Sequence, residues 1–208
     1  MEYVVLDMEH SPRRAHFAYF SGMANPYTGV TVQVDITDFL RRVKGAGEPF
    51  FLRLLYEVGA AANGVPAFRQ RILNGGVIEY AACHTSHTVL LADETFAFCK
   101  LDCTLPLAEF LPYAQAEQAR VKAAGSIEED PEESRGCFFI SSLPWLSYTA
   151  LVQAVPTPAD SNPRISWGKY FESGGRTLLP LSVLVHHALA DGKQIADFYE
   201  NLNARLEG

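Results

Sequence analysis

Two adjacent histidines near the C-terminus, followed by an Asp-Gly pair, form the segment of the chain best suited to chemistry. His186 and His187 come directly after the apolar stretch LLPLSVLV, and Asp191 and Gly192 follow in the next turn. Functional groups often lie where a rigid strand gives way to a loop, because their position is fixed while access stays open. An imidazole with an ordinary pKa of about 6.5 is mostly neutral in the cell and can accept a proton. A general base is therefore one interpretation of this segment.

Residue types alone leave other interpretations open. A histidine and an aspartate four residues apart could be ligands of a metal ion, and a histidine at a strand end is often only a structural residue. Ser141, with Pro144 and Trp145 after it, could be a nucleophile, although no GxSxG sequence surrounds it. The chain contains no Walker A or GxGxxG sequence, which disfavours nucleotide hydrolysis and dinucleotide-dependent redox chemistry.

Length and charge narrow the class of protein. The chain has 208 residues, of which 48% are apolar and 20% charged, and we predict one domain over residues 1–208. The net charge is −7 with 17 Lys and Arg, so we expect no nucleic-acid partner. No apolar run has the length of a membrane span. The N-terminal stretch MEYVVLDMEH carries acidic residues where a secretory signal carries basic ones, so we expect no targeting segment and no membrane association.

The four cysteines, at positions 83, 99, 103 and 137, indicate a reducing compartment. They form no CxxC pair, and Cys99 and Cys103 have no second pair or histidine at the spacing of a zinc site. We therefore expect free thiols and a cytoplasmic location.

Strands and helices that must position these residues alternate along the chain. Residues 27–37 place Val32, Val34 and Ile36 alternately with polar residues, which is typical of a half-buried strand. Further strands are predicted on both sides of Gly75-Gly76 and over residues 88–92, 137–142, 147–155, 164–170 and 176–186. Helices are predicted over residues 37–44, where Thr37 or Asp38 is the expected cap, and over residues 50–63, 105–124 and 191–206.

Two further features complete this outline. The last predicted helix has an apolar face made by Ile195, Phe198, Tyr199 and Leu202, and the acidic run 128–133 is expected to be a solvated loop. Interleaved helices and strands of this kind predict an α/β (α+β) sandwich. Its large sheet is mixed or mostly antiparallel and is flanked by helices.

The run HHALADG (residues 186–192) resembles the HHxxxDG signature of the chloramphenicol acetyltransferase family, which several coenzyme A-dependent acyltransferase families share. Other segments resemble further blocks of that family in their expected order. These are RRAHF (13–17), TVQVDIT (31–37), PAFR (66–69), ETF (94–96), SSLPW (141–145), SWGKY (166–170) and LPLSV (179–183). Together they cover nearly the whole chain, and the ordered set is far more specific than the heptad alone.

This resemblance implies an acetyl-CoA-dependent O-acetyltransferase without a metal ion. The family's enzymes are homotrimers with active sites between subunits, in which coenzyme A and the acceptor alcohol enter a tunnel from opposite sides. His187 is then the general base, a role worth about 10²–10⁴ in rate, and His186 is a supporting neighbour turned away from the substrate. Asp191 is implied to hold the histidine loop through a buried ion pair with Arg13.

The remaining site residues are also implied by the resemblance. Ser141 corresponds to the serine that donates to the oxyanion of the tetrahedral intermediate, and Ser166 stands where the family has a water-ordering threonine. The coenzyme A side is implied to include Trp145, Lys169 and Tyr170. The acceptor side is implied to include Phe20, Met23, Phe96, Leu151 and Gln153.

The acceptor side departs from the family pattern. Pro26 stands where a cysteine is common, Ser11-Pro12 replaces a tryptophan step before Arg13, Gln153 makes one wall more polar, and the acidic run 128–133 occupies an aromatic loop. The acceptor, whether chloramphenicol or a related small alcohol, therefore stays open. Competing hypotheses are a catalytic domain like that of a dihydrolipoyl acyltransferase, a catalytically silent trimer that binds an acyl-CoA or another ligand, and a metal-dependent hydrolase.

Overall fold

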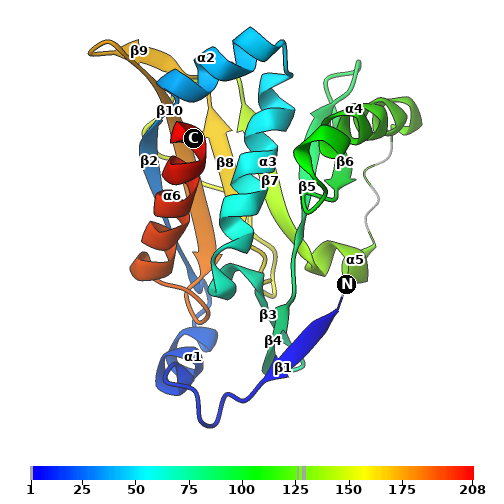
Figure 1. Ribbon diagram of the computed structural model, residues 1–208. Coiled ribbons are helices and arrows are strands. Elements are labelled where there is room, and N and C mark those ends of the chain that lie inside the picture. The colour runs from blue at the N-terminus through cyan, green and yellow to red at the C-terminus, as the bar shows by residue number, and fades with distance from the viewer. Residues whose placement is uncertain (1, 126, 128–129) are drawn as a thin grey trace.

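The protein is built around a mixed sheet with helices on one face (Figure 1). The computed structural model describes residues 2–125, 127 and 130–208. The sheet has seven strands in the order β2-β10-β8-β7-β5-β6, and β9 pairs with β10. Its strands are β2 (Tyr27–Asp35), β5 (His84–Leu90), β6 (Phe96–Leu101), β7 (Cys137–Leu143), β8 (Arg164–Gly168), β9 (Phe171–Ser173) and β10 (Arg176–His186). The pairs β5–β7 and β7–β8 are parallel and the others antiparallel, which confirms the predicted fold class.

Four helices cover this face and enclose the core, as Figure 1 shows. They are α2 (Thr37–Ala46), α3 (Phe50–Asn63), α4 (Leu107–Ala124) and α6 (Gly192–Glu207). Leu54, Leu55 and Val58 of α3 are fully buried, and the alternate residues Leu179, Leu181 and Val183 of β10 point at the helices. The predicted inner face of α6 is buried as expected. The face of β10 that carries Ser182 is therefore turned away from the helices.

A second, three-stranded antiparallel sheet lies below the main one in Figure 1, in the order β1-β4-β3. It consists of β1 (Tyr3–Leu6), β3 (Gln70–Leu73) and β4 (Gly76–Tyr80), with the 3₁₀ turn η1 (Pro66–Arg69) before it. The turn between β3 and β4 contains Gly75 at a φ of +77°, as the Gly-Gly pair predicts. Helix α1 (Arg14–Ser21) follows β1 and lies near the end of β10.

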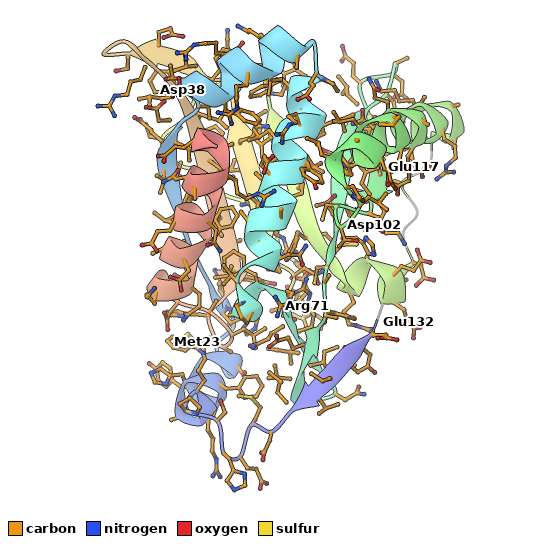
Figure 2. The ribbon with its side chains drawn as sticks, in the orientation of Figure 1. Met23, Asp38, Arg71, Asp102, Glu117 and Glu132 are labelled. Atoms are coloured by element: carbon orange, nitrogen blue, oxygen red, sulfur yellow. The ribbon has the colours of Figure 1, made fainter. Side chains whose placement is uncertain are left out.

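Arg71 joins the two sheets from the inside (Figure 2). Its side chain is completely buried and donates to the carbonyl oxygens of Phe68, Arg135 and Cys137. These acceptors lie before β3, at the end of α5 (Pro131–Arg135) and at the start of β7. Burial lowers the pKa of this guanidinium. Because its hydrogen bonds connect three segments of the chain in the interior, Arg71 is a central structural residue.

The predicted strand over residues 147–155 does not form. Since β7 and β8 are parallel, they need a long crossover, and residues 144–163 supply it across the face opposite the helices. Tyr148 attaches this crossover to the sheet, because its hydroxyl donates to the carbonyl oxygen of Ser166 at 3.1 Å. Both edges of β8 are already paired with β7 and β10, so the alternating residues of the crossover find no partner strand there.

Two other local predictions need correction. The acidic run is not all loop, because residues 131–135 form α5, whose N-cap Asp130 accepts from the backbone N–H groups of Glu132 and Glu133; Glu128 and Glu129 lie outside the described residues. The N-cap of helix α2 is Ile36, so neither Thr37 nor Asp38 is its cap; the carboxylate of Asp35 accepts from the N–H of Thr37 at 3.0 Å.

The four cysteines are buried, and none of them forms a disulfide with another described residue. Within the described part of the chain, no helix is both long and apolar enough to cross a membrane.

Candidate active site

His187 follows β10, and the backbone around it fixes its ring. Its N–H donates to the carbonyl oxygen of Pro26 at 2.7 Å, and its Nδ1 lies 3.1 Å from the carbonyl oxygen of Ala190. A carbonyl oxygen only accepts, so Nδ1 carries the proton of the neutral ring and Nε2 keeps its lone pair. No described residue forms a hydrogen bond with Nε2. This half-buried imidazole is therefore set to accept a proton at Nε2.

Phe20 of α1 sets the plane of the same ring. The two rings are stacked with centroids 3.8 Å apart and planes inclined by 20°. Met23 lies just after α1, 39% exposed, and its N–H donates to the carbonyl oxygen of Phe20 at 3.2 Å (Figure 2). Both residues implied for this end of the acceptor site thus lie at the His187 end of the fold.

His186 has the opposite arrangement. Its ring is buried, and its Nδ1 accepts from the N–H of Ala188 at 3.3 Å, so its neutral form carries the proton on Nε2. Burial lowers its pKa, and its ring meets the edge of Tyr27 at a centroid distance of 5.8 Å. His186 is turned into the protein, while His187 is partly open.

An ion pair between Arg13 and Asp191 holds the loop that carries His187. Arg13 Nη1 donates to Asp191 Oδ2 at 2.7 Å, and Arg13 Nη2 donates to the carbonyl oxygen of His187 at 3.1 Å. The hydrogen bond from Arg13 is the main cause that lowers the pKa of Asp191. Asp191 is also the N-cap of α6, accepting from the N–H of Lys193 at 3.1 Å.

The Arg13–Asp191 ion pair forms, but it is only partly buried rather than buried as the resemblance implies. The two side chains are 24% and 37% exposed. Solvent screens such a pair, and its contribution to stability is on the order of 1 kcal/mol rather than that of a dry pair.

A row of hydroxyl groups crosses the face opposite the helices. Ser141 of β7 pairs in register with Ser166 of β8, Ser166 with Ser182 of β10, and Ser182 with Thr31 of β2. The hydroxyls of Thr31 and Ser182 are 2.7 Å apart. Since register partners point to the same side of a sheet, Ser141 and Ser166 share one polar track.

A cavity of about 490 Å³ lies over this track. Its lining contains Ser141 and Ser166 together with Phe96, Leu151 and Gln153, which the resemblance implies for the acceptor. Ser166 Oγ donates to Gln153 Oε1 at 3.4 Å. Residues 151–154 come from the crossover, which forms one wall.

Within one chain, this cavity does not include His187. The implied catalytic and acceptor residues therefore fall into two groups. One group, at the end of β10, contains Arg13, Phe20, Met23, His187 and Asp191; the other, in the cavity, contains Phe96, Ser141, Leu151, Gln153 and Ser166.

The residues implied for coenzyme A follow the C-terminal ends of β7 and β8, which lie side by side because these strands are parallel. Trp145 is 66% exposed, and Lys169, also exposed, is held beside that turn by its N–H, which donates to the carbonyl oxygen of Leu146 at 2.7 Å. Tyr170 meets Phe50 edge-on at 5.6 Å. Lys44 Nζ lies 6.0 Å from the centre of the Tyr170 ring, a cation that sequence reasoning missed although it stands in the last turn of a predicted helix.

Arg164, the first residue of β8, is a second residue that sequence reasoning missed. Its guanidinium forms a two-point ion pair with Asp160, with both distances 2.7 Å, and the Tyr27 hydroxyl donates to the same carboxylate at 3.0 Å. Burial is the largest cause that raises the pKa of Tyr27 to about 12, and Asp160 adds to it. Arg164 lines the cavity. An arginine at a strand end is usually read from sequence as solvated, and no spacing signal singles it out.

A metal centre receives no support from this geometry. Across residues 2–125, 127 and 130–208, no group of three His, Cys, Asp or Glu side chains is placed to hold an ion. His186 Nδ1 and both oxygens of Asp191 are engaged in the hydrogen bonds described above.

Comparisons with known proteins agree with this geometry. The Chloramphenicol acetyltransferase family profile matches residues 1–203. A chloramphenicol acetyltransferase of Escherichia coli is 29% identical over 208 residues, which covers 96% of this chain and 92% of the relative. A solved chloramphenicol acetyltransferase superposes with a TM-score of 0.84 at 25% identity, covering 99% of this chain and all of the other. The dihydrolipoamide acetyltransferase of Azotobacter vinelandii superposes with a TM-score of 0.66 at 20% identity, with 93% and 86% covered, which is a likeness of fold alone.

Proposed function

The chain belongs to the chloramphenicol acetyltransferase family and is an acyltransferase, and on this premise we propose that it moves an acetyl group from acetyl-CoA to the hydroxyl of a small alcohol. His187 is the general base of this reaction. The observation that carries the proposal is the contact of Nδ1 with the carbonyl oxygen of Ala190, because it leaves Nε2 as the free acceptor.

In the proposed reaction, Nε2 takes the proton of the acceptor hydroxyl while that oxygen attacks the thioester carbonyl. The tetrahedral intermediate then collapses, the carbon–sulfur bond breaks, and the imidazolium returns its proton to the leaving thiolate. The products are an acetate ester and coenzyme A. Asp191 and Arg13 act as positioning residues, since Arg13 donates to the carbonyl oxygen of His187 and is itself held by Asp191.

Ser141 is proposed to donate to the developing oxyanion, a contribution worth about 2.7–4 kcal/mol of transition-state stabilisation. Ser166 is its register neighbour and lies one strand away on the same face. Its hydroxyl, 3.4 Å from Gln153 Oε1, is proposed to order a water in the site.

We propose further that each active site forms between two copies of the chain in a homotrimer. Support comes from the separation of His187 from the cavity that holds Ser141. In this arrangement His187, Phe20 and Met23 of one copy face the cavity of the next, where Phe96, Leu151 and Gln153 complete the acceptor wall.

Acetyl-CoA is proposed to bind near Trp145, Lys169 and Tyr170. The ammonium groups of Lys169 and Lys44 are cations near this turn, and they are suited to the phosphates of the cosubstrate. The exposed indole of Trp145 offers an apolar surface beside them. Four buried cysteines outside any disulfide fit the proposed cytoplasmic location.

The test is the release of coenzyme A from acetyl-CoA, followed as free thiol, with chloramphenicol and then with a panel of other alcohols. We expect acceptor-dependent release by the wild-type protein and its loss, by about 10²-fold or more, in His187→Ala. His186→Gln is the matched control, because His186 is adjacent to His187 in the sequence but is turned into the protein. If no alcohol gives release that depends on His187, the protein is a ligand-binding relative rather than a transferase.

A further inference from the structure

Among the described residues that line the cavity over the polar track, Arg164 is the only one with a charged side chain. The remaining lining side chains are apolar or neutral and polar, with Phe96, Phe98 and Leu151 among the apolar ones. The residue Arg164 is only 8% exposed. A charged group buried to this degree is stable only when its donors are satisfied, by the protein or by what the protein binds.

Three of the five N–H donors of Arg164 have acceptors in the protein. Nη1 donates to Asp160 Oδ1 at 2.7 Å and to the carbonyl oxygen of Asn162 at 3.2 Å, and Nη2 donates to Asp160 Oδ2 at 2.7 Å. The N–H of Nε and the second N–H of Nη2 have no acceptor among the described residues. These two groups lie on one edge of the planar guanidinium and point in parallel, which is the geometry that matches both oxygens of a carboxylate.

The guanidinium is also held rigidly. Its carbon lies 5.6 Å from the centre of the Tyr27 ring and 5.4 Å from that of Phe139. Asp160 is held in turn by the Tyr27 hydroxyl at 3.0 Å. A donor pair positioned in this way loses little conformational entropy when a ligand binds.

Resting on the proposed function, we propose that Arg164 binds a carboxylate of the acceptor, so that the preferred acceptors are hydroxy acids. The apolar wall of Phe96, Phe98 and Leu151 holds the carbon skeleton, and the carboxylate takes the free edge of Arg164. Acetyl transfer leaves the carboxylate unchanged, and the products are an acetoxy acid and coenzyme A.

The experiment compares hydroxy acids with their neutral methyl esters. Wild-type kcat/KM is measured for 3-hydroxybutyrate, 3-hydroxydecanoate and 3-phenyllactate and for the three esters, and the acid-to-ester ratio is calculated for each pair. A two-point charged hydrogen bond predicts a ratio above one, on the order of tenfold to hundredfold, for at least one pair. The ratio is then measured in Arg164→Met and Arg164→Lys.

We expect Arg164→Met to abolish the preference and Arg164→Lys to reduce it, because lysine keeps the charge without the planar fork. Arg176→Met is the matched control, since Arg176 is a 69% exposed arginine on the same sheet, 3.9 Å from its ion-pair partner. The acid-to-ester ratio of this variant should equal that of the wild type. Circular dichroism of each variant establishes whether it is folded. If Arg164→Met does not fold, the lysine variant alone decides.

Calorimetric titration with 3-phenyllactate separates this inference from the proposed function. Binding of the acid that weakens in the Arg164 variants, without any His187-dependent turnover, supports the carboxylate site and contradicts the transferase. Turnover that depends on His187 with equal or better use of every ester contradicts the carboxylate site and leaves the transferase intact. A preference for acids that survives in both Arg164 variants overturns the role of Arg164.

Discussion

The imidazole of His187 lies flat against the ring of Phe20, with 3.8 Å between the centroids. The stack fixes the plane of the imidazole, and the contact of Nδ1 with the carbonyl oxygen of Ala190 fixes its rotation within that plane. Together they aim Nε2, and no charged side chain among the described residues forms a hydrogen bond with the ring. The orientation of the proposed base therefore depends on an aromatic side chain from α1 and on one backbone carbonyl.

Replacing Phe20 by leucine removes the stacked face while keeping an apolar side chain. We expect kcat/KM for acetyl transfer to fall by about two- to tenfold, the value of one aromatic pair, because His187 then samples other orientations. Tyr19→Leu is the control, since Tyr19 is a 68% exposed neighbour on the same helix. Steady-state kinetics of both variants test this, and equal rates in wild type and Phe20→Leu would show that the stack does not orient His187.

Ser141→Ala tests the proposed oxyanion donor. We expect kcat to fall by about 10²-fold or more while the KM for acetyl-CoA changes little, because the hydrogen bond forms only in the transition state. Ser142→Ala is the matched control, since successive residues of β7 point to opposite faces of the sheet. A comparable loss in both variants would indicate a general disturbance of β7 rather than a lost donor.

A double-mutant cycle of Arg13→Met and Asp191→Asn measures the ion pair that holds the histidine loop. The coupling free energy of unfolding should be about 1 kcal/mol or less, since both side chains are partly exposed. We expect either single variant to reduce acetyl transfer, because Arg13→Met removes the hydrogen bond to the carbonyl oxygen of His187 and Asp191→Asn removes the ion pair that holds Arg13 in place. A coupling of zero in stability together with full activity would contradict the positioning role.

The same pair predicts a pH dependence of stability. Arg13 holds the pKa of Asp191 below its ordinary value of 3.8, so the stabilisation is complete above about pH 4 and is lost as the pH falls through the lowered pKa. The difference in unfolding free energy between wild type and Asp191→Asn should therefore be larger at pH 7 than at pH 3. Denaturant titrations at both values check the sign, and a larger difference at pH 3 would refute it.

Arg71 provides a prediction for the fold alone. Arg71→Met removes the buried donors to the carbonyl oxygens of Phe68, Arg135 and Cys137. The last two keep a hydrogen bond from Asn162 Nδ2, so the loss falls most heavily on Phe68. We expect a loss of about 3 kcal/mol or more in the free energy of unfolding. Arg176→Met, on an exposed side chain, should change it by about 0.5 kcal/mol or less. Similar losses in the two variants would show that the buried hydrogen bonds contribute little.

Local periodicity predicted most of the main elements. Helix α3 and strand β10 have the predicted bounds, because the first has a continuous helical pattern and the second an apolar run long enough to be buried on both sides. Strand β1 was not predicted, because its four residues are exposed or half-buried and become a strand only by pairing with β4, far along the chain. The prediction of a strand over residues 147–155 was wrong for the opposite reason. Its alternating residues look like a strand locally, but β8 is already paired on both edges and offers no free edge.

Only some of the proposed site residues could be identified from the sequence. His186, His187 and Asp191 are neighbours in the sequence and stand out by type. Arg13, by contrast, lies 178 residues from Asp191, and only the family resemblance pointed to it. No sequence pattern pointed to Arg164, because its proposed role depends on a cavity that it lines together with residues 151–154 of the crossover.

If His187 of one copy and Ser141 of the next form one acetyl-transfer site, mixed oligomers can restore activity that each variant lacks. His187→Ala and Ser141→Ala chains, each inactive alone, are co-expressed with different tags and purified through both. In a ring of three that contains both kinds of chain, about one site in three has both groups intact. We predict that coenzyme A release by the doubly purified mixture recovers to about a third of the wild-type rate. A mixture no more active than its two parents would contradict a site shared between copies.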